Sequence, residues 1–187
     1  FAQQGVTQCG TSTGQPKFPI ETYEELPDPT PPSDKEWAAV ITTQVSWGTT
    51  DVRYAKHKLP QLKKQQIAVL KGWRGERVNA QAVVWTGAEV KDLNFSFTDF
   101  KDKKGNSLSN EAFKGGFIRY VMTDELNKDG RGACGHRKAV DFDSLLVADP
   151  IDTNLKSLAL PSRTVQPIWV QCWIPQSATP GTYKGAL

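Results

Sequence analysis

Carboxylates are the residues of this chain whose number and spacing could support catalysis. Glycoside hydrolysis, for example, needs two of them flanking the scissile bond. Three stretches supply candidates, namely "TDFKDKKG" (98–105), "MTDEL" (122–126) and "VDFDSLLVADPID" (140–152). Each carboxylate lies beside a turn, where aspartate is favoured for backbone reasons. No pair lies in an apolar setting that would raise a pKa, so the sequence singles out no acid and base.

Histidine and cysteine offer a second kind of chemistry, nucleophilic catalysis. The histidines are His57 and His136, and no G-x-S-x-G elbow supplies a nucleophile for either. Cys134 lies two residues before His136, but no third group stands nearby to orient the imidazole. A packed cysteine beside a solvated histidine is therefore favoured. With Cys9 and Cys172 the cysteines number three and lack a C-x-x-C, so they encode no zinc site. One disulfide with a free thiol, or three reduced thiols, both stay open.

The stretch "ELNKDGRG" (125–132) has the spacing of a calcium loop. Glu125, Asn127, Asp129 and Gly130 follow the acid-x-Asn-x-Asp-Gly pattern. However, His136 stands where the bidentate glutamate belongs, and no flanking helices are indicated. A polar hairpin loop explains the same residues, so we expect no metal and no other cofactor.

Aromatic residues carry the more specific signal. In "IWVQCWIP" (168–175), period-2 alternation places Trp169, Gln171 and Trp173 on one strand face and aliphatic residues on the other. Aromatic planes pack on the C–H faces of sugars while an amide supplies directional hydrogen bonds, so this face could bind carbohydrate, with Trp85 as a third tryptophan. The alternative, which we favour, is that the face packs against another element or domain.

These residues must be positioned by strands, because β-branched and alternating segments dominate the chain. Strands are expected within 38–48, 77–87, 90–100, 116–125 and 165–175, with turn signals between them. Even-numbered residues from Val78 to Val84 should share one face, as should Leu93, Phe95 and Phe97. The stretch 59–73 fits a short helix or a strand pair equally well. The pattern predicts an all-β fold, an antiparallel two-sheet β-sandwich of jelly-roll or immunoglobulin-like type.

The N-terminal part differs in composition from the rest. Residues 1–36 combine a Gln/Thr/Gly/Ser-rich start with "LPDPTPPSDKEW" (26–37), which predicts a flexible tail and a Pro-rich tether. The sandwich domain should then span 37–187. The 23 basic and 20 acidic residues are mixed along the chain, which does not suggest a nucleic-acid partner. No apolar run reaches the roughly 18 residues of a membrane span.

Several segments resemble a known family in their order along the chain. They are "VSWGTTDVRYAKHKLP", "LKGWRGERVNAQAVVWTG", "FIRYVMTDE", "CGHRK…DSLLVADPID" and "TVQPIWVQCWIPQSATPGTYKGAL". Together they resemble the N-terminal β-sandwich domain of glycoside hydrolase family 123-like proteins, the DUF4091 group found mostly in Bacteroides-type gut bacteria. The most specific pieces are Trp-x-Gly-Glu-x-x-x-Ala-Gln (73–81) and the Pro-x-Trp…Pro-Gly-x-Tyr-x-Gly ending (167–185). The resemblance covers about residues 38–187.

The resemblance implies a function for the parent protein rather than for this chain. In that family the sandwich precedes a (β/α)₈ barrel whose Asp–Glu pair acts on N-acetylhexosaminides with help from the substrate's acetamido group. No part of the barrel matches here, so no catalytic residue is carried over. We expect a non-catalytic accessory domain that supports a C-terminal catalytic barrel and the glycan cleft, in a secreted, periplasmic or outer-membrane-associated protein. An independent carbohydrate-binding module is the alternative, and a protein–protein interaction domain is a third.

The C-terminal stretch "SATPGTYKGAL" (177–187) resembles the turn that opens the family's last sandwich strand. By this resemblance the chain is a fragment that stops a few residues into that strand. A strand edge left open invites pairing with another chain. We therefore expect either that another chain supplies the missing strand or that Thr182–Leu187 pairs only partly.

Overall fold

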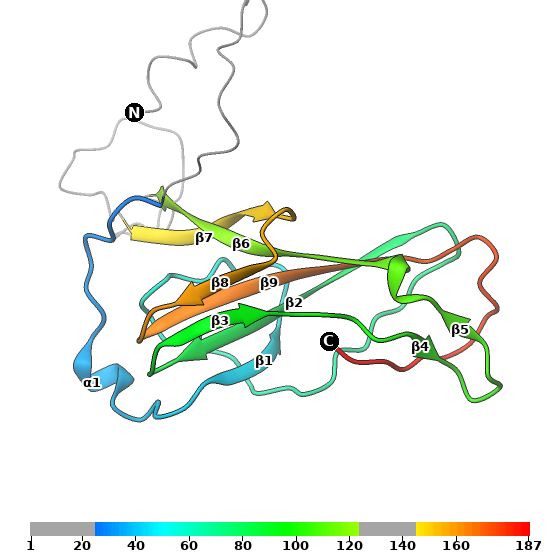
Figure 1. The fold of residues 1–187 in the computed structure, drawn as a ribbon, viewed down its shortest axis with the longest axis horizontal. Helices are drawn as coiled ribbons and strands as arrows, with labels where there is room; N and C mark the ends of the chain where they lie inside the picture. Colours follow the sequence, from blue (N-terminus) through cyan, green and yellow to red (C-terminus); the bar gives the residue numbers. More distant parts are fainter. Residues whose placement is uncertain (1–24, 124–144) are drawn as a thin grey trace, which may run out of the picture.

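The structure is a computed structural model that describes residues 25–123 and 145–187, and its regular secondary structure is almost entirely β-strand (Figure 1). In chain order the elements are α1 (Asp34–Trp37), β1 (Gln44–Gly48), β2 (Arg77–Thr86), β3 (Val90–Asn94), β4 (Phe100–Lys101), β5 (Ser107–Leu108), a 3₁₀ turn (Asn110–Ala112), β6 (Phe113–Thr123), β7 (Leu145–Asp152), β8 (Ser157–Leu160) and β9 (Thr164–Trp173). The predicted all-β class is therefore confirmed.

The strands form one large sheet and two small ones, all antiparallel. The main sheet has the order β1-β2-β9-β6-β7, so its centre is the late strand β9. The pairs β3–β8 and β4–β5 make the small sheets. In Figure 1 the β3–β8 pair lies over β2 and β9, which gives the two layers of a sandwich. The strands β7 and β8 were not among those expected from the sequence.

Alternation along β2 and β9 decides which side chains face the second layer. Ala80 pairs with Val170 and Ala82 with Ile168, and all four side chains are buried in one cluster with Phe117 of β6. The partly buried residues around this cluster are Trp47, Val90, Leu93, Phe95, Phe97, Leu155 and Leu158. The predicted faces of β2 and of the Leu93–Phe97 segment are confirmed.

The opposite face of the main sheet is covered at one end only. There Val83, Trp85 and Val165 form a second cluster with Trp37 of α1 and Tyr54 of the long loop after β1. The loop is fastened by backbone hydrogen bonds to β7 and β9, and the Trp37 indole N–H donates to the His57 carbonyl at 2.8 Å. Trp37 is thus buried against the outer face of the main sheet.

The stretch 59–73 is neither a helix nor a strand pair. It runs without regular secondary structure, and Gln65 lies beside the free edge of the main sheet. The Trp47 amide donates to the Gln65 carbonyl at 2.9 Å, and the Gln65 amide donates to Ser46 Oγ at 2.8 Å. Pro60 cannot donate a backbone hydrogen bond, and Lys63 with Lys64 keeps the middle of the stretch in water, which explains the absence of either regular form.

The acidic residues of the tether hold it against the sandwich. Glu25 pairs with Lys56 and Arg119, and Asp34 pairs with Arg163. Asp28 Oδ2 lies 3.9 Å from His57 Nε2. Ion pairs thus attach residues 25–36 to the strands and loops of the domain. The predicted flexible tail before residue 25 lies outside the described residues. The domain boundary at residue 37 stays a prediction.

The C-terminal segment pairs partly with β4. Lys101 and Lys184 exchange both backbone hydrogen bonds at 2.9 Å, and the Thr98 amide donates to the Ala186 carbonyl at 3.1 Å. A Cβ on Gly185 would lie 2.2 Å from the Phe100 ring, so this position needs a glycine. Of the two expectations for Thr182–Leu187, partial pairing within the same chain is the one that the structure shows.

Candidate functional site

The aromatic face predicted from the sequence exists on β9. Trp169, Gln171 and Trp173 all point away from the buried cluster, because Ile168, Val170 and Cys172 occupy the other face. Trp173 is 53% exposed. Trp169 is partly buried against a third cluster, formed by Ile118, Tyr120, Leu146 and Ala148. The exposed part of this face is therefore centred on Gln171 and Trp173.

Cross-strand neighbours on β2 occupy much of this face. Gln171 lies opposite Asn79 and donates its amide N–H to Asn79 Oδ1 at 3.2 Å. Trp173 lies opposite Arg77, whose guanidinium carbon is 4.6 Å from the centroid of the indole ring. This cation–π contact covers one face of the ring. A ligand would meet the remaining ring surface and the basic group together.

Trp85 does not belong to the exposed face. It is 6% exposed and lies in the cluster with Trp37 and Tyr54, with Lys64 Nζ 5.7 Å from its ring centroid. The expectation that Trp85 is an accessible sugar platform is therefore corrected. Its parity along β2 does place it on the same side as Trp173, but α1 and the loop after β1 cover that end. Alternation shows the side of a side chain and not what lies above it.

Sequence reasoning named Trp73 only as part of a family motif, yet it is 84% exposed. It begins a tight turn in which the Glu76 amide donates to the Trp73 carbonyl at 3.1 Å and Gly75 has φ +82°. The Glu76 carboxylate accepts from the Trp73 amide at 2.7 Å. The Gly and Glu of the motif thus shape this turn, and its final Gln81 is buried, donating to the Thr49 and Val52 carbonyls.

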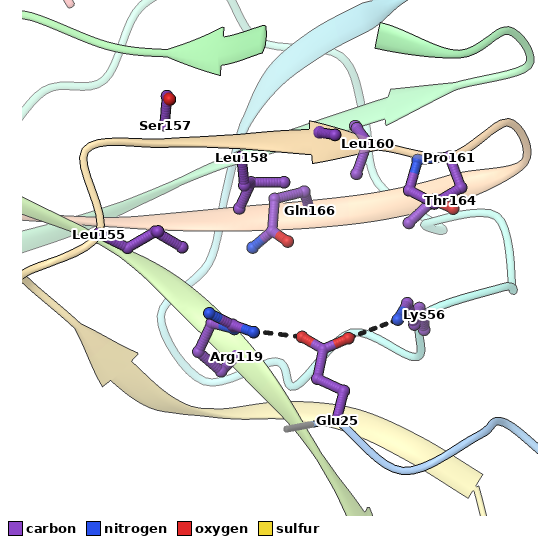
Figure 2. Close-up of a pocket in the computed structure, with 11 residues that line it drawn as sticks. Glu25, Lys56, Arg119, Leu155, Ser157, Leu158, Leu160, Pro161, Thr164 and Gln166 are labelled. Atoms are coloured by element: carbon purple, nitrogen blue, oxygen red, sulfur yellow. Dashed lines mark hydrogen bonds and ion pairs between the residues drawn. The ribbon is translucent and has the colours of Figure 1, made fainter. Parts of the chain in front are cut away.

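A pocket of about 280 Å³ lies between β8 and the main sheet (Figure 2). Its apolar wall comes from Leu155, Leu158, Leu160 and Pro161. Its polar wall comes from Gln166 of β9, Arg119 of β6, Lys56 and Glu25. Figure 2 shows the Glu25 carboxylate between Arg119 and Lys56. Four parts of the chain that are distant in sequence meet here.

Ion pairs occupy the charged groups of this pocket. Glu25 Oε1 lies 3.2 Å from Arg119 Nε, while Oε2 contacts Lys56 Nζ. Arg119 also reaches Asp152 Oδ2 at 3.7 Å. All these side chains are less than a third exposed. The carboxylates are thus held by cations, and Gln166 donates its amide to the Ile118 and Pro167 carbonyls. The arrangement fixes the tether and offers no unengaged acid–base pair.

Two groups with shifted pKa values are also structural. Burial raises the pKa of the Tyr120 phenol well above its ordinary value, helped by the negative charges of Glu25 and Asp28. Its hydroxyl donates to the Val165 carbonyl. Burial likewise raises the pKa of the Cys172 thiol. A raised pKa keeps a thiol protonated, which is the opposite of what a nucleophile needs.

The remaining sequence candidates carry no chemistry that the structure supports. His57 Nδ1 lies 2.9 Å from the Arg163 carbonyl, so the ring links two loops. Among residues 25–123 and 145–187, no group of three His, Cys, Asp or Glu could hold a metal ion. In the same part of the chain, no helix is long and apolar enough to cross a membrane. The candidates outside the described residues are Cys9, Cys134, His136 and the calcium-like loop with Glu125, Asn127, Asp129 and Gly130.

Comparisons with known proteins show which family this chain belongs to. A solved structure from Clostridium perfringens, reported as a family 123 glycoside hydrolase that acts on glycolipid glycans, superposes with a TM-score of 0.62 at 22% identity. The match covers 77% of this chain and 24% of that one. The search of curated proteins finds no match. The sequence model of the glycoside hydrolase 123 N-terminal domain matches residues 47–187. The chain therefore belongs to glycoside hydrolase family 123, as its N-terminal domain.

Proposed function

We propose that this chain is a non-catalytic accessory domain that supports the catalytic domain of its parent glycoside hydrolase. The observation that carries the proposal is that the titratable groups at the pocket already have structural partners. Within the described residues, Glu25 and Asp152 both form ion pairs with Arg119, and Tyr120 and Cys172 are buried and neutral. A domain whose polar groups already serve folding has a structural role. Family membership supports this, because an N-terminal domain has a catalytic domain beside it.

The family also suggests a substrate class for the parent protein. The resemblance implies an N-acetylhexosaminidase-like activity, and the similar Clostridium perfringens protein acts on glycolipid glycans. We expect the parent protein to hydrolyse terminal N-acetylhexosaminides by the reaction of its catalytic domain. We also expect it to be secreted, periplasmic or outer-membrane associated, which fractionation of the source cells with an antibody would test.

Kinetics of the full-length protein test the non-catalytic role. Glu25→Gln and Asp152→Asn remove the two carboxylates at the pocket. With a 4-nitrophenyl N-acetylhexosaminide as substrate, kcat should stay within about twofold of the wild type, because general acid–base groups contribute 10²–10⁴-fold and these groups are expected to contribute none. The midpoint of thermal unfolding should fall. A loss of a hundredfold or more in kcat for a variant that still folds would show that this domain takes part in catalysis.

The second candidate, a carbohydrate-binding module, is favoured by the exposure of Trp173 beside Arg77 and Gln171. It would use Trp169, Gln171 and Trp173, without the buried Trp85. Titration of the protein with N-acetylhexosamine oligosaccharides, followed by NMR, distinguishes the two. Chemical shifts at Gln171 and Trp173 that saturate, and that vanish in Trp173→Ala, would support sugar binding.

A further inference from the structure

The largest group of exposed apolar side chains in the described part of the chain comes from one short segment. Ile67 is 75% exposed, Val69 78%, Leu70 45% and Trp73 84%. Single exposed apolar residues are ordinary, whereas four within seven positions concentrate exposed apolar side chains in one segment. We call the segment Ile67–Trp73 the apolar strip. Its sequence fits a helix and a strand pair equally well, so neither pattern indicated which of its side chains would be exposed.

The apolar strip also carries unpaired backbone groups. Among the described residues, no hydrogen bond involves the backbone of 67–72. The strip lies along the edge of the main sheet, because Gln65 bonds to β1 before it and Gly72 lies close to Val78 and Ile174 after it. β1 ends opposite Gln81, so the first residues of β2 have no β1 neighbour. Backbone N–H and C=O groups left free beside a sheet edge can pair with another chain.

The chain is held by backbone hydrogen bonds on both sides of the apolar strip, which limits the conformations open to the strip before a partner binds. At the N-terminal end the Gln65 backbone bonds to Ser46 and Trp47. At the C-terminal end the Gly75 amide donates to the Ile174 carbonyl at 2.7 Å, and the Ile174 amide donates to the Glu76 carbonyl at 2.9 Å. A surface that is ordered in advance loses less conformational entropy on binding. Tryptophan is among the residues that most often anchor protein interfaces, and Trp73 has this position at the end of the apolar strip.

We propose that the apolar strip is the surface on which the catalytic domain of the same protein docks. The inference rests on the proposed accessory role, and it adds the place of contact. The match to an N-terminal domain family implies a catalytic domain in the parent protein, and this chain spans only 24% of the similar solved chain. A protein partner can cover the aliphatic side chains and also satisfy the free backbone groups. A sugar would need a ring platform flanked by polar side chains, and three of the four exposed residues are aliphatic.

The charges around the apolar strip indicate what kind of surface on the catalytic domain would complement it. The stretch 63–77 holds five basic residues, Lys63, Lys64, Lys71, Arg74 and Arg77, against one acidic residue, Glu76. We therefore expect the docking face of the catalytic domain to be apolar at its centre with carboxylates at its rim, since complementary potentials fix the register of an interface.

Hydrogen exchange in the full-length protein tests the proposal directly. Among the described residues the amides of 67–72 have no acceptors, so they should exchange about as fast as an unfolded chain unless another domain covers them. Ile41 and Thr42, whose amides also lack acceptors among the described residues, serve as the internal reference. Docking predicts that peptides covering 67–72 exchange at least tenfold more slowly than the reference. Equal rates would overturn the proposal.

A pair of exposed-residue variants adds specificity. Val69→Asp places a charge in the apolar strip, and Ile41→Asp places the same charge on a side chain that is 82% exposed elsewhere. Neither site is buried, so both variants should fold. Protection of 67–72 should be lost in Val69→Asp and kept in Ile41→Asp. Protection that survives Val69→Asp would contradict docking through the strip.

Two outcomes separate this proposal from its alternatives. If 67–72 slow only when phosphatidylglycerol vesicles are added, the apolar strip is a lipid-binding surface and the docking proposal is wrong. If 67–72 exchange freely while Glu25→Gln and Asp152→Asn keep full activity, the contact surface is wrong but the accessory role stands. Loss of activity in those two variants, with 67–72 protected, would overturn the accessory role and keep the contact.

Discussion

The two faces of the main sheet follow the same alternation along β2 and β9 but differ in what covers them. The inner face is closed by the β3–β8 pair and by Phe95 and Phe97. The centroid of the Phe95 ring lies 5.2 Å from that of Phe117 and 6.0 Å from that of Phe97. The outer face is covered at the Trp85 end and open at the Trp173 end. The comparison shows that alternation along a strand decides which face of the sheet a side chain lies on. Whether that side chain is buried depends on segments that are distant in the sequence.

The open end of the outer face is also where the polar content is highest. Arg77, Asn79 and Gln171 lie there, paired across the strands. Toward the covered end the polar side chain of Gln81 is buried and holds the loop after β1 by hydrogen bonds to the Thr49 and Val52 carbonyls. Polar residues on this face therefore have two roles, solvation at one end and attachment of the covering loop at the other.

The largest loss of stability should come from a substitution on the inner face of the main sheet. Phe117→Ala removes a fully buried ring at the centre of the main cluster. Loss of a buried phenylalanine typically lowers the free energy of unfolding by about 3–5 kcal/mol. Urea denaturation followed by circular dichroism would measure this change. Phe113→Ala, at a less buried ring on the same face of the same strand, is the matched control and should cost less. An equal loss would show that stability does not depend mainly on the cluster around Phe117.

The ion pairs of the tether should contribute an intermediate amount. Glu25→Gln keeps the size of the side chain but removes the charge that Lys56 and Arg119 share. Hydrogen bonds to charged groups contribute about 1.5–3 kcal/mol, so we expect a loss of about 1–2 kcal/mol in the free energy of unfolding. The loss should shrink at 1 M NaCl because salt screens the pairs. A salt-independent loss would assign the effect to packing.

Tyr120 should make stability depend on alkaline pH. Burial raises its pKa in the folded protein, whereas in the unfolded chain a tyrosine ionises near pH 10. The stabilisation is therefore complete below about pH 10 and is lost as the pH rises further. Tyr120→Phe should cost about 1 kcal/mol at pH 7 through the lost bond to Val165, and should flatten the decline above pH 10. Urea midpoints at pH 8 and 10.5 in both proteins test this, and equal declines would contradict it.

The smallest loss of stability should come from a substitution at the open end of the outer face. Trp173→Ala removes an exposed ring and its contact with Arg77, which is worth about 0.5–1 kcal/mol at exposed sites. Trp85→Ala removes the same side chain from the covered end and should cost about 3–5 kcal/mol. Thermal or urea unfolding of the two variants compares the ends directly. Equal losses would show that the outer face is uniformly covered in solution.

Much of the fold could be predicted, for reasons that lie in local sequence. Period-2 alternation placed Ala80, Ala82 and Val84 on one face of β2, and turn residues marked where strands end. The strands β7 and β8 were missed because Pro150 interrupts one and the other is only four residues long. The order β1-β2-β9-β6-β7 could not be predicted, since pairing between distant strands leaves no local signal.

The candidate sites were predictable in part. The face of Trp169, Gln171 and Trp173 followed from alternation alone. The burial of Trp85 depends on Trp37 and Tyr54, which reach it from parts of the chain that are distant in sequence. The pocket with Glu25 was missed for the same reason, because its charged residues come from the tether, a loop and β6.

By itself the sequence determined the fold class, the two faces of each long strand and, through its motifs, the family. These properties depend on neighbours within about ten residues, where backbone geometry dictates side-chain direction. Only the tertiary structure decided which tryptophans are buried, where the tether attaches and that Ile67–Trp73 stays uncovered. Those properties depend on which distant segments pack together, and many arrangements of the same strands satisfy the same local pattern.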